Sequence, residues 1–507
     1  MFVKSFGSAV IGIDANTITI EVQVDRGAQL MMVGLPDTAV KESMQRIRAA
    51  IANSGFKNAV RSITINMAPA DLRKEGAAYD LPVALAMLAG TEQMLAKDLD
   101  RYIIMGELSL DGSLRSIKGA LPMAIKAKKE GFKGLIIPKE NAEEAAIVAG
   151  IDVIPAESLQ QIVDFFNEVQ NISPLKSSIE SLLQRQPQNS NVDFCDVKGQ
   201  LNIKRAFLIA AAGGHNVLMV GPPGAGKTML AKRLPGILPP LTMNEALEAT
   251  KIHSVAGKLR TKNGLIVERP FRSPHHTISD VALVGGGSIP QPGEISLAHH
   301  GVLFLDELPE FKRTVLEVLR QPLEDRVVTI SRSRFTIDFP AGFMLVASMN
   351  PCPCGYYNHP TKACVCGPGI VQKYLNKISG PLLDRIDLHV EVTPVNFDEL
   401  TQSKAAENSA SLREQVIQAR CFQLQRSSQY NAALTTAQLK KYAPLNSACQ
   451  SLLKTAMERL KLSARSYDRI IRVSRTIADL EGSEHIQTHH LSEAIQYRSL
   501  DRENWAG

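Results

Sequence analysis

The sequence predicts an α/β fold with a buried sheet in the middle of the chain. Three separate apolar runs, at 216–220, 301–305 and 343–349, have the length and composition of buried strands. Each run ends at polar or glycine-rich residues, and the first is followed, after a glycine-rich segment, by the start of a helix. The chain after about residue 396 has helical patterns and few strand signals, so a helical domain is expected beyond the core.

The first part of the chain, 1–170, mixes strand and helix patterns and therefore predicts an α+β domain. The segment at 17–24 alternates at period two, as a half-buried strand does, and the run at 81–88 is apolar throughout, which favours a helix. The expected elements, in order, are a strand at 17–24, a helix that Asp37 caps and that stops at Gly55, a strand at 62–66, a helix at 81–88, a strand at 103–110, a helix at 120–129 and a strand at 134–138.

Composition changes at 171–194, where Ser, Gln, Asn and Pro are frequent, and this predicts a linker. A short helix is expected inside it, at 175–183. The predicted domains are therefore 1–170, the linker at 171–194, an α/β core at 195–395 and a helical domain at 396–507.

The overall composition is that of a water-soluble globular protein with two to four domains. The chain has 507 residues, of which 44% are hydrophobic and 21% charged. No apolar stretch approaches the ~18 residues of a membrane span, and no secretory leader is evident, so a cytoplasmic protein without membrane contact is expected. A net charge of +6 permits nucleic-acid binding but does not argue for it.

A glycine-rich segment between the first strand and its helix matches the phosphate-binding P-loop, Gly-x-x-x-x-Gly-Lys-Thr. The backbone N–H groups at the helix start would hold phosphates, Lys227 would reach the β- and γ-phosphates, and Thr228 would bind Mg²⁺. ATP and Mg²⁺ are therefore the expected ligands. The segment consists of Gly221, Pro222, Pro223, Gly224, Ala225, Gly226, Lys227 and Thr228.

Polar residues that follow the other strands extend this site. Asp306 can hold Mg²⁺, and Glu307 can polarise the attacking water. Asn350 can reach the γ-phosphate, and Arg385 can act on the nucleotide of a neighbouring subunit. Taken singly, acids often end strands, Asn350 would more often cap a turn, and Arg385 would more often form a surface ion pair.

This ordered set resembles the AAA+ ATPases, in the group that includes magnesium-chelatase subunits and MCM helicases. The resemblance assigns Walker A to the P-loop, Walker B to Asp306 and Glu307, and sensor 1 to Asn350. It also assigns the arginine finger to Arg385 and sensor 2 to Arg465. It implies a hexameric ring with nucleotide between subunits. Two further arginines at helical spacing, Arg472 and Arg475, are expected on a solvated basic face.

Two segments of the core are expected to project from it. Glycine and proline in 281–298 predict an exposed loop or hairpin, which resembles the helix-2 insertion of the same AAA+ group. The segment 326–337 predicts a hairpin with its turn near 331–334, which resembles the pre-sensor-1 hairpin. Arg332 and Arg334 at its tip would contact DNA phosphates without reading sequence, although an ordinary exposed turn is an equal alternative.

Upstream of these hairpins, His275 and His276 are adjacent within a segment that looks typical of chelatase-like ATPases. Two neighbouring histidines could bind a metal ion, but an ordinary polar loop is favoured.

Four of the seven cysteines form two Cys-x-Cys pairs directly after Asn350. Cys352, Cys354, Cys364 and Cys366 could close a tetrahedral Zn²⁺ site, with His359 able to replace one thiolate. Clustering in a cytoplasmic chain favours a metal over unrelated thiols, although the spacing is tighter than the common Cys-x₂-Cys. Cys195, Cys421 and Cys449 are isolated and are expected to be ordinary thiols.

The N-terminal domain resembles the Lon protease domain in the segments 106–112 and 131–141. The position of the Lon serine falls on Ala78, and that of the Lon lysine falls on Leu121, with Lys118 three residues earlier. Because acyl transfer needs a nucleophile, no peptidase activity is expected. The domain is expected to shape the ring, bind DNA or recruit a partner.

Together these features are similar to the ComM (YifB) family over nearly the whole chain. The segments 272–276 and 350–355 make the resemblance specific. It implies an ATP-driven DNA motor for branch migration in homologous recombination during natural transformation, with recombination proteins as possible partners. Two rival functions are a metal-chelatase motor, which the Lon-like domain argues against, and a protein-remodelling ring.

Overall fold

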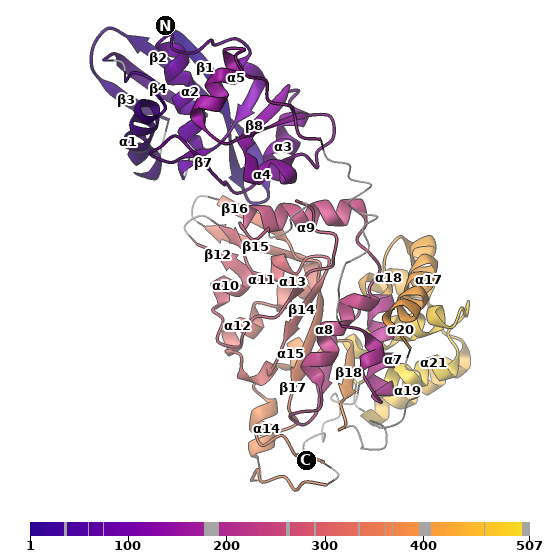
Figure 1. Ribbon diagram of the computed structural model, residues 1–507. Helices are drawn as coiled ribbons and strands as arrows, with labels where there is room; N and C mark the ends of the chain where they lie inside the picture. Colours follow the sequence, from indigo (N-terminus) through magenta and orange to yellow (C-terminus); the bar gives the residue numbers. More distant parts are fainter. Residues whose placement is uncertain are drawn as a thin grey trace. The chain divides into compact units, whose positions relative to one another are not determined.

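The computed structural model describes residues 1–498 apart from several short gaps. The gaps are 35–37, 59, 73, 75, 177–191, 260–263, 288–289, 333–334, 360, 368, 395–406 and 461. Two compact units make up the chain: the first contains Met1–Gln186 and Met243–Val267, and the second contains Pro187–Thr242 and Glu268–Gly507 (Figure 1). Within the described residues, no helix combines the length and apolar content that a membrane crossing requires.

A mixed seven-stranded sheet lies at the centre of the first unit, in the order β3-β4-β2-β1-β5-β8-β9. β2 pairs antiparallel with both β1 and β4, and the other neighbours are parallel. Ile18, Ile20 and Val22 of β2 are fully buried while the residues between them are half exposed, which is the period-two pattern of a strand with one face in the core. The strands are β1 (Phe2–Ile11), β2 (Asp14–Asp25), β3 (Leu30–Val33), β4 (Ser62–Ala68), β5 (Tyr102–Ile104), β8 (Gly134–Pro138) and β9 (Asp152–Ala156), with a separate pair β6 (Glu107–Leu108) and β7 (Leu114–Arg115).

Helices cover this sheet, and one of them comes from a distant part of the sequence. α9 (Met243–Val255) packs against α3 (Ala120–Lys129). Ser254 of α9 donates a hydrogen bond to the buried carboxylate of Glu144, and Lys251 Nζ lies 2.8 Å from Asp14 Oδ1. The remaining helical elements are α1 (Thr38–Asn53), η1 (Ala77–Tyr79), α2 (Asp80–Gly90), η2 (Leu99–Arg101), α4 (Lys139–Ala145) and α5 (Leu159–Phe166).

The compact units therefore divide the chain differently from the sequence-based domains. Residues 243–267 pack within the first unit, although the expected ATPase core at 195–395 includes them. Most of the expected linker, and the helix expected at 175–183 beyond residue 176, lie outside the described residues.

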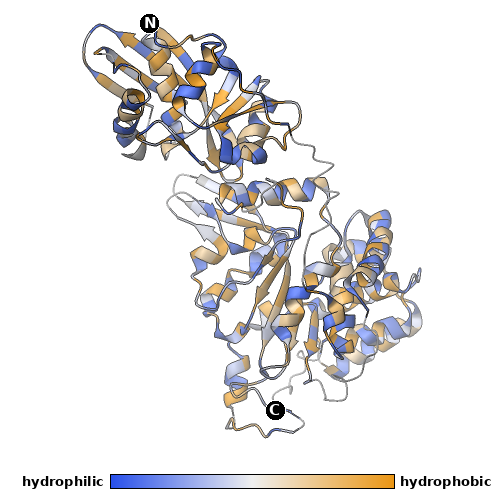
Figure 2. Ribbon diagram, in the orientation of Figure 1, coloured by the Kyte–Doolittle hydropathy of each residue, from blue (hydrophilic) through white to orange (hydrophobic). Residues whose placement is uncertain are grey.

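The second unit contains a parallel five-stranded sheet in the order β11-β14-β17-β10-β18. All residues of β10, β14 and β17 are buried, as expected for interior strands of a parallel sheet covered on both faces. In Figure 2 hydrophobic residues gather along these strands. The α/β fold class predicted from the three apolar runs is confirmed. The strands are β10 (Val217–Val220), β11 (Phe271–Arg272), β14 (Val302–Leu305), β17 (Met344–Met349) and β18 (Leu388–Glu391).

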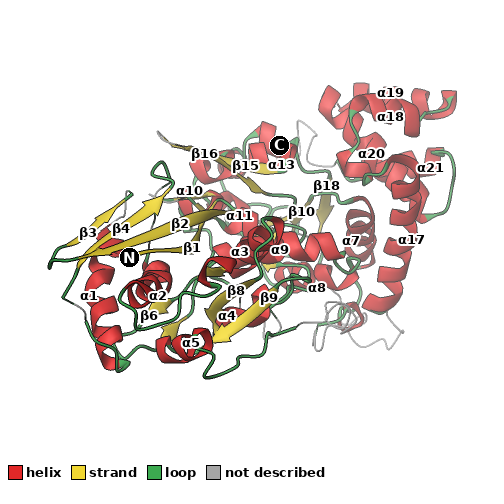
Figure 3. Cartoon of the chain, turned by 90° about the horizontal axis from the view of Figure 1, so that it is seen from above, coloured by secondary structure: helices red, strands yellow, loops and turns green. Residues whose placement is uncertain are grey.

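The C-terminal part of the second unit is helical, as predicted. Figure 3 shows its helices gathered together, and the described residues from 407 to 498 contain no strand. Asn408 and Ser463 accept hydrogen bonds from backbone N–H groups in the first turns of α17 and α20, which fixes where these helices begin. The helices are α17 (Ser409–Ser427), η5 (Asn431–Ala433), α18 (Thr436–Tyr442), α19 (Ser447–Leu460), α20 (Ala464–Leu480) and α21 (Thr488–Gln496).

This helical region shares one hydrophobic core with the sheet. Val217 and Met219 of β10, Leu412 of α17 and Ile470 of α20 belong to the same buried cluster. α7 (Leu201–Gly213) connects the two because it packs against both α17 and α20. The C-terminal helices are therefore packed, through α7, against the sheet that carries the P-loop.

Two small antiparallel hairpins and several short helices complete the second unit. β15 (Val327–Arg332) pairs with β16 (Phe335–Pro340), which confirms the hairpin predicted at 326–337. In the segment 281–298, β12 (Gly285–Gly286) pairs with β13 (Gln291–Pro292). The other elements are η3 (Phe194–Asp196), α8 (Lys227–Ile237), α10 (Asp280–Val284), α11 (Glu294–Leu297), η4 (Leu308–Glu310), α12 (Arg313–Glu317), α13 (Arg320–Asp325), α14 (Ile370–Leu375) and α15 (Gly380–Leu383).

Candidate functional site

The predicted P-loop connects β10 to α8 at the carboxyl end of β10, an interior strand of the sheet. Gly224 and Gly226 have φ angles of +79° and +83°, in the left-handed region that favours glycine. The N–H of Gly221 donates to the carbonyl of Met349 on β17, at 3.2 Å. The loop is thereby attached to the neighbouring strand, and α8 begins at Lys227 with its first N–H groups free to meet an anion.

Lys227 is buried and held by oxygen atoms of the loop and of a second strand. Its Nζ donates to the carbonyls of Gly221 (2.6 Å) and Pro222 (3.0 Å) and to Oδ1 of Asn350 (3.0 Å). Burial lowers the pKa of Lys227, and the charges of Asp306 and Glu307 oppose that shift. An ammonium group in this position can exchange its carbonyl partners for phosphate oxygens. The contact also brings two predicted residues, Lys227 and Asn350, to one point.

The predicted Mg²⁺ ligands also meet. Thr228 Oγ1 donates to Asp306 Oδ2 at 2.7 Å, although the two residues come from α8 and from the end of β14. Ser348 of β17 donates to the other oxygen, Oδ1, of Asp306. A hydroxyl and a carboxylate are oxygen ligands of the kind Mg²⁺ prefers, so this pair fits the ion.

Sequence patterns did not identify Ser348, because a serine inside an apolar strand carries no motif. Its position was nevertheless fixed by the register, in which Leu305 of β14 lies opposite Ala347 of β17. The residue after each of these two strand partners, Asp306 and Ser348, therefore falls at the same edge of the sheet.

Glu307 adopts a left-handed backbone conformation with φ of +55°, which is uncommon for a residue with a side chain. Its side chain is 55% exposed, and Oε2 lies 3.6 Å from Nδ1 of His276. The expected ordinary polar loop at His275 and His276 thus contains one histidine that faces the predicted catalytic acid. His275 differs, because its Nδ1 contacts Thr277 Oγ1 at 3.0 Å.

The predicted arginine finger, Arg385, is buried in its own chain. Its side chain is 7% exposed, and NH2 lies 2.6 Å from Glu324 Oε1 while NH1 donates to the carbonyl of Pro381. The Nε atom is buried and has no hydrogen-bond partner among the described residues. Among the contacts of those residues, none joins Arg385 to Lys227 or Asp306.

Arg465, the predicted sensor 2, lies in the first turn of α20 and is mostly exposed. Its NH1 atom is 3.9 Å from Asp384 Oδ2, so the ion pair is loose. Arg469, one turn further along, instead pairs with the buried Asp387, which precedes β18. Burial alone would raise the pKa of Asp387, but Arg469, His215 and the N–H of Asn216 hold it well below its usual range.

The solvated basic face predicted for Arg472 and Arg475 is wrong. Arg475 is 1% exposed, donates from Nε to Asp479 at 3.1 Å and from NH1 to the carbonyl of Glu484 at 2.8 Å. Arg472 is half-buried and donates to the carbonyl of Leu434. Both arginines face the other C-terminal helices because α20 is surrounded by them, which charge spacing along one helix cannot indicate.

The two arginines predicted to contact DNA lie at the tip of the β15–β16 hairpin, of which the structure describes only a part. Arg332 is the last residue of β15, with its backbone opposite Phe335, but its side chain lies outside the described part of the structure. Arg334 lies outside it altogether. The neighbouring insertion packs close to this hairpin, since a Cβ placed on Gly285 would lie 3.1 Å from Cδ1 of Ile330.

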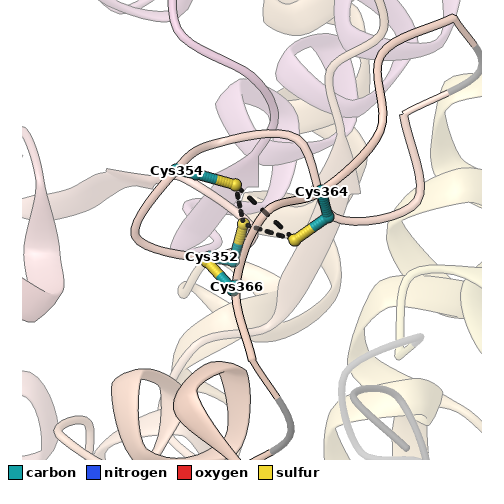
Figure 4. Close-up of side chains that lie close together, drawn as sticks. All are labelled: Cys352, Cys354, Cys364 and Cys366. Atoms are coloured by element: carbon teal, nitrogen blue, oxygen red, sulfur yellow. Dashed lines mark hydrogen bonds between the residues drawn. The ribbon is translucent and has the colours of Figure 1, made fainter.

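The four predicted metal ligands converge in the loop between β17 and α14, as Figure 4 shows. Cys352 Sγ lies 3.3 Å from Cys354 Sγ and 3.7 Å from Cys364 Sγ, and the latter two are 3.5 Å apart. The sulfur of Cys366 lies within 4.8 Å of the other three. A tetrahedral zinc site with Zn–S bonds of about 2.3 Å places its sulfurs about 3.8 Å apart, so the four thiols fit Zn²⁺.

The surroundings of these sulfurs act in different directions, because burial and the neighbouring thiols raise the pKa of Cys364 and of Cys366 against the lowering effect of backbone N–H groups. Backbone N–H groups of Tyr356 and Val365 lower the pKa of Cys354 to about 6. No disulfide is formed by any of the seven cysteines, and Cys195 and Cys421 are exposed. His359 is not part of the four-sulfur group, and its Nδ1 accepts from the N–H of Lys362.

In the first unit, the positions that would carry a Lon-type dyad hold no nucleophile. Ala78 lies in η1 with a methyl side chain, and Leu121 is fully buried in α3. Lys118 is exposed. Lys74 is buried, but its Nζ donates to the carbonyls of Gly34 and Pro69.

Three family models match the chain. One described as magnesium chelatase, subunit ChlI, matches residues 193–400, and one described as subunit ChlI of Mg-chelatase matches 20–141. A third, the ChlI C-terminal model, matches 406–498. The P-loop, Asp306, Asn350 and the cysteine loop all fall within the first match.

Curated relatives match over nearly full length. The chain is 45% identical to the uncharacterised protein YifB of Escherichia coli K12, over 97% of this chain and 96% of the relative. It is 45% identical to the competence protein ComM of Haemophilus influenzae, over 98% and 97%. The magnesium-chelatase subunit ChlI of a Nostoc species is 23% identical over 57% of this chain and 72% of that protein.

Proposed function

Because the chain belongs to the ComM/YifB family of magnesium-chelatase-like AAA+ proteins, we propose that it is an ATP-driven DNA motor. In this proposal it forms a hexameric ring in the cytoplasm, moves along DNA and promotes branch migration in homologous recombination during natural transformation. The observation that carries the proposal is the assembled nucleotide site, in which Lys227 contacts Asn350 and Thr228 contacts Asp306.

The chain's own residues divide the work of ATP hydrolysis. The P-loop N–H groups and Lys227 bind the phosphates and carry compensating positive charge. Thr228 and Asp306 would hold Mg²⁺, and the ion would supply positive charge next to the phosphates. Glu307 orients the attacking water, and Asn350 reports on the γ-phosphate. Ser348 holds Asp306 in the orientation that binds the ion.

A ring is part of this proposal because, among the described residues, no contact joins Arg385 to Lys227 or Asp306 of the same chain. Arg385 would serve the nucleotide of the neighbouring subunit, and Arg465 would act as sensor 2. Assembly must then release Arg385 from Glu324, a partner that is half exposed and so can be replaced at a modest energetic cost.

DNA would be held by the hairpin β15–β16, through Arg332 and Arg334 and without reading base sequence. The packing of the 281–298 insertion close to this hairpin supports a joint role for both. Recombination proteins are candidate partners. The first unit is proposed to have no peptidase activity, because Ala78 supplies no nucleophile.

We also propose that Cys352, Cys354, Cys364 and Cys366 hold one Zn²⁺. The mutual distances of their sulfurs support this ligand set. The ion would have a structural role, since four thiolates leave no open coordination position.

The deciding experiment measures ATP-dependent migration of synthetic three-way and four-way DNA junctions. The wild-type chain should convert the junctions to products, and Lys227→Ala should not, because it loses the phosphate-binding ammonium. If the wild type hydrolyses ATP but leaves the junctions unchanged, the motor proposal fails.

A second candidate function is a chelatase-like motor, which the ChlI matches favour. Stimulation of porphyrin metallation by the wild type would support it. An ATPase rate raised by unfolded protein but unaffected by DNA would instead support a protein-remodelling ring.

A further inference from the structure

The cysteine loop does not project freely from the second unit but contacts the P-loop. Gly355, which directly follows the first Cys-x-Cys pair, has a φ of +84°. A Cβ placed on it would lie 2.5 Å from Cδ and 3.1 Å from Cγ of Pro223. Only glycine therefore allows the cysteine loop and the Pro223 ring to approach this closely.

The same loop is attached to the nucleotide site at its start. Asn350, whose side chain accepts from Lys227, is separated from Cys352 by a single residue. The N–H of Gly355 donates to the carbonyl of Cys352 at 3.0 Å, which closes a tight turn. Cys352 is fully buried. The geometry of this thiol is thereby fixed together with both nucleotide-site contacts.

A third connection runs through α14, which begins shortly after Cys366. Tyr374 of α14 is buried, which raises the pKa of its hydroxyl, and the backbone N–H of Asn350 opposes that rise. α14 therefore returns the chain to Asn350, where the loop begins. The four cysteines lie between Asn350 and Tyr374 in the sequence. Since residues 350–369 contain no helix or strand within their described part, side-chain contacts must maintain this arrangement.

We infer that the four-cysteine centre acts as a metal-dependent support of the P-loop, so that nucleotide affinity depends on bound Zn²⁺. This inference rests on the zinc site proposed above. Binding of four side chains to one ion removes most of the conformational entropy of a long loop. The ordered loop then restricts Pro223, which it contacts, and Asn350, from which it starts. Loss of the ion would free the loop, withdraw the support and leave the P-loop to be ordered by the nucleotide itself, at a cost in affinity.

The first measurement tests whether the chain binds zinc, independently of any effect on nucleotide affinity. Zinc content of the purified full-length chain is determined by mass spectrometry for wild type, Cys364→Ser and Cys421→Ser. One ion per chain is expected in the wild type and in Cys421→Ser, whose exposed thiol lies on α17 outside the cluster. Cys364→Ser should lose the ion. Absence of zinc from the wild type would defeat the zinc proposal itself.

The second measurement is the dissociation constant of a fluorescent ADP analogue, which requires no hydrolysis and no DNA. Cys364→Ser should bind the analogue about tenfold more weakly, which corresponds to about 1.4 kcal/mol, and Cys421→Ser should bind as the wild type does. Should Cys364→Ser fail to fold, a chelator can remove zinc from the folded wild type. Affinity should then fall and recover when zinc is restored. If the dissociation constant does not change when zinc is removed, the inference is wrong, but the proposal that the cysteines bind zinc still stands.

A double-mutant cycle tests the path through Pro223. Pro223→Ala shortens the side chain that meets Gly355 and keeps all four cysteines, so zinc should stay bound. In that background the effect of Cys364→Ser on affinity should shrink to about twofold or less. If the two effects are instead additive, the support does not run through this contact and the inferred path is wrong.

Discussion

Thr228 on α8 donates a hydrogen bond of 2.7 Å to Asp306 at the end of β14, across 78 residues of sequence. The two proposed Mg²⁺ ligands are thus already adjacent in the fold. The second oxygen of Asp306 is occupied by Ser348, so this carboxylate is held from two sides. An ion entering here would exchange one protein hydrogen bond for coordination bonds without a large movement of either side chain.

The first prediction concerns the hydroxyl of Thr228. Thr228→Val keeps the shape of the side chain but removes the oxygen, and we expect kcat for ATP to fall about 100-fold, equivalent to about 3 kcal/mol. Thr228→Ser should retain most of the activity because it keeps the oxygen. Steady-state ATPase assays over a Mg²⁺ titration measure both. Equal activity of the Val and Ser variants would remove Thr228 from the ion's ligand set.

The second prediction assigns a positioning role to His276. Its Nδ1 lies 3.6 Å from Glu307 Oε2, and Glu307 is otherwise half exposed. We expect His276→Ala to lower kcat about tenfold with little change in KM, since general-base catalysis contributes about 10²–10⁴ and only its orientation is disturbed. The adjacent His275→Ala is the matched control and should change kcat less than twofold. A loss in KM alone would point to nucleotide binding instead.

The features of this site that could be predicted from the sequence are those encoded by residues close together in the chain. Continuous apolar runs identified β10, β14 and β17, and the P-loop pattern identified Lys227 and Thr228. Such features are specified by residues that are adjacent in the sequence. Ser348, His276 and the burial of Arg475 depend on which strands and helices become neighbours, and no local pattern specifies that. The same reason explains why α9 was expected with the ATPase core.

The third prediction tests Arg385 as a residue that acts between subunits. Arg385→Ala should reduce ATPase activity about 10³-fold without weakening nucleotide binding. Mixing Arg385→Ala chains with Lys227→Ala chains should restore part of the activity, because a mixed ring contains interfaces with one intact P-loop and one intact arginine. Absence of recovery in verified mixed oligomers would mean that Arg385 acts within its own chain.

The control for that experiment is a variant of Glu324, which forms an ion pair with Arg385 within the same chain. Glu324→Gln removes the charge of the ion pair at 2.6 Å while leaving the arginine in place. If Arg385 acts as an arginine finger, Glu324→Gln should keep activity within about threefold, because the carboxylate of Glu324 is half exposed. A loss as large as that of Arg385→Ala would assign both residues to maintaining the structure.

The last prediction concerns the link between α20 and the strand β18. Asp387 is buried and pairs with Arg469, and its pKa is held well below the usual range. Removing one partner of such a buried pair costs about 3–5 kcal/mol, so Asp387→Asn should increase hydrogen exchange of α20 amides sharply. Asp384→Asn, which removes only the loose partner of the exposed Arg465, should change the opening free energy by less than about 1 kcal/mol.

The pH dependence of that link follows from the direction of the pKa shift. A carboxyl whose pKa is lower in the folded state than in the unfolded chain contributes its full stability above the unfolded value, about 3.9. The contribution is lost as pH falls through the folded value. Protection of α20 in the wild type should therefore exceed that of Asp387→Asn by the same amount at pH 5 and pH 8, and the two should converge only in strong acid. Convergence already near pH 5 would show that Asp387 does not hold the helix through its charge.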